Sequence, residues 1–174
     1  TDYDKFLRHG MDLVIIATPD PLHAQQAAQA LEGGVGVVSE VPAATTVEDA
    51  RRLVQAFRKA GGFYMLLENY GYRDENELIR RMVQAGQFGD VYFGEGEYLH
   101  DCRGLNRFTD GSLTWRGRSF SGYVYIWHSL RPLLYILDDR PKRITAMGTM
   151  QPGRLRPLRD EMGIAGGVRN LQWL

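Results

Sequence analysis

Short apolar runs alternate with helix-forming stretches through the first 70 residues. The runs are typical of strands buried on both faces, and they cover residues 12–17, 35–40 and 63–68. Between them, apolar side chains recur at helical spacing over residues 22–31 and 47–60, and a glycine pair follows each stretch. Thr46 is a good N-cap for the second stretch. The alternation predicts βαβ units with parallel strands and right-handed crossovers.

The pattern changes after residue 70. The elements expected there are a helix at 73–85, a strand at 91–99, a long loop at 100–122, a helix at 127–137 and a strand at 142–150. The looser, aromatic-rich alternation of the first of these strands suits an antiparallel sheet with one covered face. Pro132 fits only the first turn of a helix, which favours a start of the second helix nearer residue 130.

These patterns divide the chain into three parts. Residues 1–70 form the first, residues 71–150 the second, and residues 151–174 an irregular, poorly packed tail. Residues 1–9 predict a surface helix that leads into the strand at 12–17. A sheet of this kind would not normally begin with that strand. We therefore expect a strand–helix–strand unit to precede Thr1.

Composition favours a globular protein that acts on small molecules. The 174 residues are 44% apolar, and 21 basic residues balance 21 acidic ones, so no net field draws the chain to nucleic acid or an anionic membrane. One cysteine excludes an internal disulfide, and no stretch is apolar and long enough for a signal or a membrane span, which makes the cytoplasm the default location. His100, Asp101 and His128 lack a close metal-ligand spacing, so no metal is expected.

Polar residues follow each predicted parallel strand. The carboxyl ends of such strands meet at the edge of the sheet where ligands bind, so residues there are candidates for contact with a ligand. The candidates are Thr18 and Pro19 after the first strand, Glu40 and Pro42 after the second, and Glu68 and Asn69 after the third. An acid in the position of Glu68 has no packing role, which favours function. His23 is also consistent with a structural role in the first turn of a helix.

A second group of candidates follows residue 90. Tyr98, Tyr125 and His128 could transfer protons, and His100, Arg103 and Trp115 could contact a substrate. The plain alternatives stay open: Tyr98 could pack in a sheet, and a lone histidine at the start of a helix is often a cap or a core residue. No Gly-x-Gly-x-x-Gly sequence for a dinucleotide's pyrophosphate occurs anywhere in the chain.

At this point the sequence resembles the Gfo/Idh/MocA oxidoreductases. The matching pieces are Asp-Leu-Val-Ile-Ile-Ala-Thr-Pro at 12–19 with His23 downstream, the Glu40-x-Pro42 triplet and the Gly-x-Phe-Gly-Asp-Val turn at 86–91. Glu-Val-Pro-Ala-Ala, Leu-Glu-Asn, Glu-x-Tyr-x-His-Asp-x-Arg and Tyr125-x-x-His128 are most similar to the branch that contains glycoside hydrolase family 109.

The resemblance implies a fold and a set of roles. The fold class is α/β: a partial Rossmann-type parallel sheet followed by part of an α+β domain with an open, mainly antiparallel sheet. NAD or NADP would lie against Thr18, Pro19, His23, Glu40, Pro42 and Asn69. Tyr98 and His128 match proposed catalytic positions of the branch, with Glu68 and Tyr125 as binding or assisting groups, and the four would converge around one cavity. Family members commonly form homo-oligomers.

Two departures from the family pattern matter. Most members carry a proton-transferring lysine between the Glu and Pro of the triplet, where this chain has Val41. The glycosidase branch tends to show Thr-His-Gly-Leu-Gly-Pro, and here Arg131 stands in place of its second glycine.

Three functions follow as hypotheses. The first is an NAD(P)-dependent oxidoreductase acting on a sugar or cyclic polyol. The second is an NAD-dependent glycosidase, similar to N-acetylgalactosaminidases, that cleaves by transient oxidation and elimination. The third is a non-catalytic remnant or sugar-binding protein, which Val41 and the missing phosphate loop would explain.

Overall fold

A computed structural model describes residues 2–101, 103–116, 125–146 and 171–173. The chain forms two compact units, Thr1–Asn69 and Tyr70–Leu174, and each is described by itself.

Unit 1 contains a parallel sheet of three strands. They are β1 (Leu13–Ile16), β2 (Gly36–Ser39) and β3 (Tyr64–Leu66), hydrogen-bonded in the order β1-β2-β3. Val14 pairs with Val37, which pairs with Tyr64, and both ladders are parallel. The α/β class and the parallel pairing predicted from the apolar runs are confirmed.

The helices of unit 1 match the predicted stretches. They are α1 (Tyr3–Leu7), α2 (His23–Glu32), which follows the 3-10 turn η1 (Asp20–Leu22), and α3 (Val47–Ala60). The Thr46 hydroxyl caps α3 by accepting the backbone N–H of Asp49 at 3.0 Å. Gly61 ends α3 in the left-handed region, at φ 62°.

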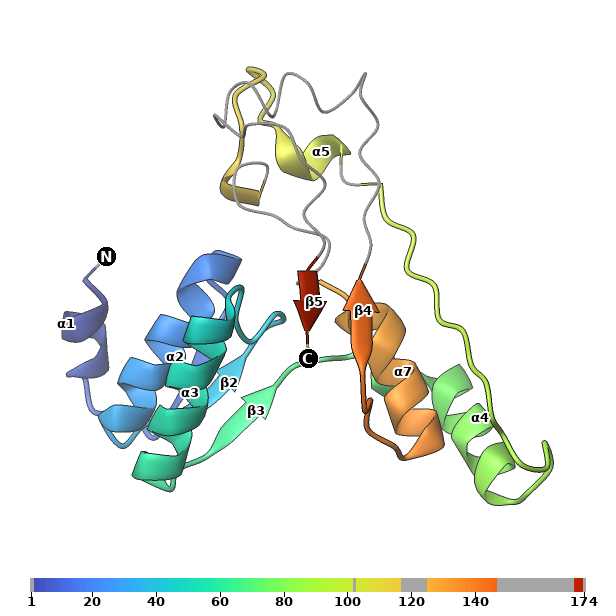
Figure 1. Ribbon diagram of the computed structural model, residues 1–174. Helices are drawn as coiled ribbons and strands as arrows, with labels where there is room; N and C mark the ends of the chain where they lie inside the picture. The colour runs from blue at the N-terminus through green and yellow to red at the C-terminus, as the bar shows by residue number, and fades with distance from the viewer. Residues whose placement is uncertain (1, 102, 117–124, 147–170, 174) are drawn as a thin grey trace. The chain divides into compact units, whose positions relative to one another are not determined.

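The core of unit 1 lies between its helices and its sheet. Helices α2 and α3 lie side by side against the strands (Figure 1). Alanines of α2 are buried at a spacing of three, which lets the helix approach Val14 and Val37 closely. The opposite sheet face is open among the described residues, since Ile15 is 66% exposed. The prediction that β1 is buried on both faces is therefore wrong, because no described helix covers that second face.

Unit 2 is built around two helices. It contains the 3-10 turn η2 (Tyr70–Tyr72), α4 (Asp74–Gln84), α5 (Arg103–Asn106), α7 (Trp127–Leu137) and an antiparallel pair, β4 (Ile144–Ala146) with β5 (Leu171–Trp173). Helix α4 packs on α7, where the Tyr135 hydroxyl donates to the Glu77 carboxylate at 2.8 Å. Arg80 Nε donates to the Tyr135 backbone oxygen at 3.1 Å.

The strand predicted at residues 91–99 is absent from the described part of the chain. The segment instead runs along α7 and pairs with no described strand. A Cβ on Gly94 would lie 3.1 Å from Leu133 Cδ2, and one on Gly96 would clash with the Ser129 backbone oxygen. The glycines let the backbone approach a helix, and this packing explains the irregular alternation that suggested a sheet.

Three further predictions for unit 2 need correction. The predicted loop at 100–122 contains the helical turn α5, and its residues 102 and 117–122 lie outside the described part. Helix α7 has the predicted bounds of 127–137, and the alternative start nearer residue 130 is wrong. Pro132 lies in the helix interior, because packing against η2 and α4 offsets the one hydrogen bond that proline removes. Leu171–Trp173 forms a strand where an irregular tail was expected, while residues 147–170 lie outside the described part.

Candidate functional site

The carboxyl edge of the parallel sheet carries the predicted cofactor residues of unit 1. Thr18 and Pro19 are half-buried after β1, and Glu40 is exposed after β2, next to the buried Pro42. The Val41–Pro42 peptide bond is cis. Asn69 follows β3 and is exposed. The strand ends thus present these groups at one edge, as parallel pairing requires.

Glu68 also follows β3, and its side chain is only 5% exposed. It belongs to unit 1, whereas the other three predicted catalytic residues belong to unit 2. The predicted convergence of all four residues therefore stays a prediction.

His23 is buried beneath the carboxyl edge of the sheet, where a side chain exposed to a cofactor was expected. Its ring is 1% exposed, with Nδ1 2.9 Å from the Pro42 backbone oxygen and Nε2 2.6 Å from the Thr18 backbone oxygen. The Thr18 hydroxyl donates to Gln26 Oε1 at 2.6 Å. Both ring nitrogens of His23 are engaged, so the ring joins the turn after β1 to the turn after β2. This geometry corrects the expected cofactor contact and favours the structural alternative.

Three predicted catalytic residues of unit 2 come together. The His128 ring lies 4.8 Å from the Tyr98 ring and 5.2 Å from the Tyr125 ring, between centroids, and the two tyrosine rings are 6.3 Å apart. His128 is the second residue of α7 and is 7% exposed, while both tyrosines are half-buried. Phenols and imidazoles are the kinds of side chain that transfer protons to and from a substrate.

Tyr70 belongs to the same cluster and was missed in the sequence. Its ring is 4.3 Å from the His128 ring and 5.4 Å from the Tyr98 ring, edge to face. The signal was present, because Tyr70 directly follows the Leu-Glu-Asn patch. We name Tyr70, Tyr98, Tyr125 and His128 the phenol–imidazole cluster.

Of the three predicted substrate-binding residues, two lie near this cluster. His100 is exposed, with its ring 5.8 Å from that of Tyr98. Trp115 is exposed, and the Arg116 guanidinium lies 4.9 Å over its ring and 5.6 Å over the Tyr125 ring. Arg103 begins α5, and its side chain lies outside the described part. Two of the three residues, His100 and Trp115, are therefore near the cluster.

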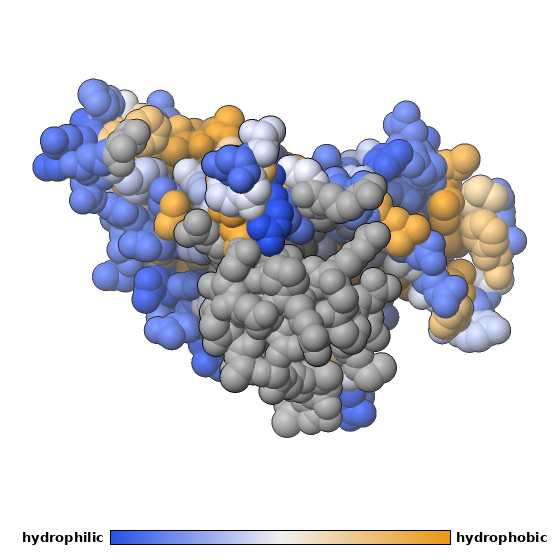
Figure 2. All heavy atoms as spheres, turned by 90° about the horizontal axis from the view of Figure 1, so that it is seen from above, coloured by the Kyte–Doolittle hydropathy of each residue, from blue (hydrophilic) through white to orange (hydrophobic). Residues whose placement is uncertain are grey.

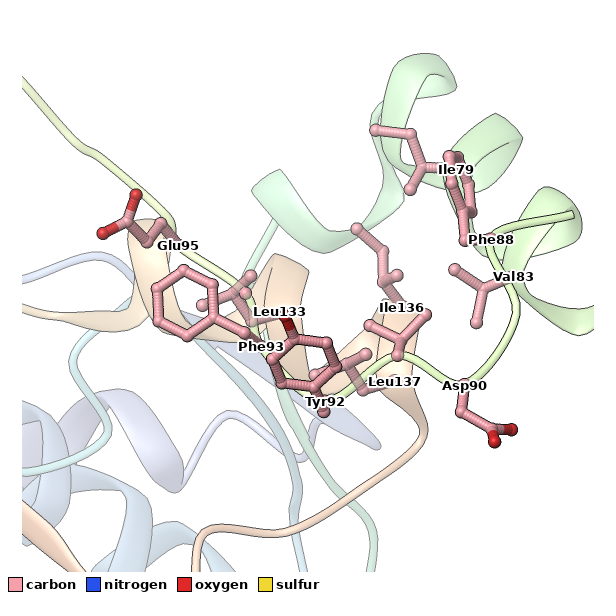
Figure 3. A pocket seen from close by; sticks show the side chains of 12 residues that line it. Ile79, Val83, Phe88, Asp90, Tyr92, Phe93, Glu95, Leu133, Ile136 and Leu137 are labelled. Atoms are coloured by element: carbon pink, nitrogen blue, oxygen red, sulfur yellow. The ribbon is translucent and has the colours of Figure 1, made fainter. Parts of the chain in front are cut away.

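A cavity of about 480 Å³ lies elsewhere in unit 2. Figure 3 shows its lining of apolar side chains from α4, α7 and the segment that joins α4 to residue 95, with the carboxylates of Asp90 and Glu95 at its margins. Apolar surface is also visible over this part of the molecule in Figure 2. No predicted site residue lines the cavity. It lacks convergent polar groups that would orient a sugar, so we place the candidate site at the cluster.

Within the described ranges, no group of three or more His, Cys, Asp or Glu side chains could hold a metal ion. The same residues include no helix long and apolar enough to cross a membrane.

A parallel sheet with polar groups at its carboxyl edge is typical of open α/β domains, which bind ligands at the ends of their strands. Residues 1–67 match the family described as oxidoreductase family, NAD-binding Rossmann fold. This match confirms the resemblance stated from the sequence: residues 1–67 are similar to the Gfo/Idh/MocA oxidoreductases.

Curated relatives extend the similarity into unit 2. A glycosyl hydrolase family 109 protein of Saccharopolyspora erythraea is 36% identical over 163 residues, which are 87% of this chain and 35% of the relative. An alpha-N-acetylgalactosaminidase of Shewanella oneidensis is 31% identical over 155 residues, 84% of this chain and 34% of that protein. The chain thus spans about a third of the length of these relatives.

Among solved structures, scyllo-inositol dehydrogenase from Lactobacillus casei, with bound cofactor NAD(H) and scyllo-inositol, matches with a TM-score of 0.50 at 27% identity. The match covers 52% of this chain and 27% of that chain.

Proposed function

We propose that this chain contributes to an NAD(P)-dependent oxidoreductase that acts on a sugar or cyclic polyol. The observation that carries the proposal is the phenol–imidazole cluster, in which His128 lies within 4.3–5.2 Å of three tyrosine rings. The family match of residues 1–67 and the inositol dehydrogenase neighbour support the cofactor and the substrate class.

Unit 1 has residues that fit a nicotinamide cofactor. Thr18, Pro19, Glu40 and Asn69 would contact it, since all follow strand ends at one edge of the sheet. Pro42 is fully buried and would shape the turn. The buried His23 fixes two of these turns through backbone oxygens, which leaves the edge side chains available. When bound, the cofactor accepts hydride from a carbon that bears a hydroxyl group.

Proton transfer in this proposal falls to the cluster. The residue between Glu40 and Pro42 is Val41, which is apolar and 6% exposed, so it supplies no proton acceptor. Tyr98 or His128 would accept the proton of the substrate hydroxyl as hydride leaves the carbon that bears it, and Tyr125 would assist or orient the sugar. Glu68 would act as a binding or assisting carboxylate.

A second candidate is an NAD-dependent glycosidase similar to N-acetylgalactosaminidases. It is favoured by the glycosyl hydrolase family 109 relatives, whose similarity covers 84–87% of this chain. In this reaction, oxidation of the hydroxyl would acidify the neighbouring C–H. A base of the cluster would remove that proton while the glycosidic oxygen leaves and takes a proton from an acid of the cluster. Addition of water and return of the hydride would then complete the hydrolysis without net reduced cofactor. The two functions would use the same residues and differ in whether reduced cofactor accumulates.

The test measures two products from the purified chain with NAD or NADP. Stoichiometric NADH from inositols or free sugars supports the oxidoreductase. Release of nitrophenol from a nitrophenyl N-acetylgalactosaminide without net NADH selects the glycosidase. Absence of both products, together with no heat of NAD binding in calorimetry, contradicts both functions and favours a non-catalytic protein. His128→Gln should abolish either activity, while Arg140→Ala, an exposed substitution beyond α7, should leave it unchanged.

We also expect homo-oligomers, since Tyr92 is 97% exposed and its neighbour Phe93 is exposed as well. Light scattering on the purified chain tests this, and a monomer at micromolar concentration would contradict it.

A further inference from the structure

The Tyr-Gly-Tyr turn η2 lies along one face of α7. His128, Arg131 and Tyr135 follow one another on α7 at spacings of three and four residues, so their side chains share a face. This face contacts η2, and the end of the face at His128 belongs to the phenol–imidazole cluster.

The contacts run in register along the two elements. The Tyr70 ring lies 4.3 Å from the His128 ring. A Cβ on Gly71 would lie 3.0 Å from Arg131 Cγ and 3.2 Å from Arg131 Nε, so the side chain of Arg131 fills the space beside this glycine. Arg131 Nη2 then donates to the Tyr72 hydroxyl at 3.1 Å. One side chain thus contacts the turn at both Gly71 and Tyr72.

The guanidinium of Arg131 is itself held by aromatic rings. It lies 5.5 Å over the Tyr72 ring and 5.3 Å over the Tyr135 ring, and these two rings are 5.3 Å apart. Tyr135 is fixed in turn by its hydrogen bond to Glu77 and by the Arg80 guanidinium 4.5 Å over its ring. A planar guanidinium suits such a site, because it stacks on rings and donates at its edge.

We propose that Arg131 is a positioning residue for the candidate site: it holds η2 against α7 and thereby sets the Tyr70 ring on the His128 imidazole. Arg131 does not belong to the cluster and acts through Gly71 and Tyr72. The effect of Arg131 on catalysis rests on the proposed function. The coupling between Arg131 and the position of the Tyr70 ring on His128 depends only on the structure of unit 2.

The experiment follows the His128 ring directly by NMR. The chain contains four histidines, so selective labelling of histidine gives few signals, and His128→Gln assigns the one of interest. Arg131→Ala should remove the ring-current shift that Tyr70 imposes on His128. Arg131→Lys keeps the aliphatic stem beside Gly71 but loses the planar stack, so the shift should be restored in part.

Two controls separate positioning from general damage. Arg140→Ala removes an exposed guanidinium just after α7 and should leave the His128 signal in place. The His23 signal reports unit 1 and should be the same in every variant. A His128 signal that is identical in Arg131→Ala and the parent chain overturns the proposal.

A second variant covers the case in which Arg131→Ala unfolds unit 2. Gly71→Ala places a methyl group against the stem of Arg131, so it should shift the His128 signal when arginine is present. An unchanged His128 signal in a folded Gly71→Ala chain overturns the proposal. Where Arg131→Ala does fold, adding Gly71→Ala to it should cause no further shift, and equal effects of Gly71→Ala in both backgrounds also overturn the proposal.

The outcome is independent of turnover. Shifted His128 signals in a chain with no activity on any sugar contradict the proposed function and keep the coupling. Activity on a sugar together with an unchanged His128 signal in Arg131→Ala supports the proposed function and contradicts the coupling.

Discussion

His23→Ala should be among the most damaging single substitutions in unit 1. The substitution removes a ring that is 1% exposed and deletes the contacts of its two nitrogens with the Thr18 and Pro42 backbone oxygens. These contacts join the turns that follow β1 and β2. Their loss should loosen the edge of the sheet where a cofactor would bind.

The magnitude follows from what the ring leaves behind. An unsatisfied buried carbonyl costs about 1–3 kcal/mol, and this cost applies mainly to the Pro42 oxygen, because the bond to Thr18 is only partly buried. A large-to-small change in a core adds a cavity term, so we expect a total loss of about 3–4 kcal/mol in the free energy of unfolding. The whole free energy of unfolding of a domain is only about 5–15 kcal/mol. His23→Gln keeps one donor and should lose about half as much.

The assay is amide hydrogen exchange at Val37, in the central strand. Its N–H donates to the Phe63 oxygen at 2.9 Å, and its side chain is fully buried, so exchange requires opening of the unit. A loss of 3–4 kcal/mol should accelerate exchange by about two to three orders of magnitude. The exposed His9→Ala is the matched control, with an expected change within about 0.5 kcal/mol. Exchange in His23→Ala within threefold (roughly 0.6 kcal/mol) of the parent would refute the reasoning.

Three further predictions concern the other elements. Thr46→Ala removes the cap of α3 and should cost about 1 kcal/mol in urea unfolding. Gly96→Ala should displace the segment at 91–99 from α7, seen as lost NMR contacts to the helix, because its Cβ would clash with the Ser129 backbone. Hydrogen bonds from the Tyr135 hydroxyl and then from Arg81 lower the pKa of Glu77 below its ordinary 4.5. These bonds therefore stabilise unit 2 fully above pH 4.5, and their contribution is lost as the pH falls through the lowered pKa. The same bond raises the pKa of Tyr135 above 10.0, so deprotonation removes it at high pH.

Each of these has its own contrary result. A fully stable Thr46→Ala chain would mean that α3 is held by packing alone. Unchanged contacts in Gly96→Ala would show that the segment does not touch α7. Circular dichroism of Glu77→Gln during acid titration should lack the wild-type transition of α4, and an identical transition in both chains would contradict the role of Glu77.

Local chemistry in the sequence was enough to predict unit 1. Apolar runs, glycine pairs and one threonine cap gave the strands and helices in order, and α3 was predicted with the bounds that the structure shows. The reason is that parallel βαβ units depend on local propensity and on a right-handed crossover, both of which are properties of neighbouring residues. The candidate residues at the strand ends were identified on the same grounds.

Long-range packing decided the rest. The alternation at 91–99 suggested a strand, and only the contact of Gly94 and Gly96 with α7 shows a segment that follows a helix. His23 faces backbone oxygens of two turns that lie 5 and 19 residues away, a partnership that no local pattern reveals.

The sequence by itself determined which residues are candidates for chemistry, because side-chain type and strand-end position are local. Only the tertiary structure decided which of them meet: Tyr70 joins Tyr98, Tyr125 and His128 because η2 lies along α7. These contacts form between segments that are far apart in the sequence. The packing that brings them together involves residues throughout the unit, so no single stretch of sequence predicts it.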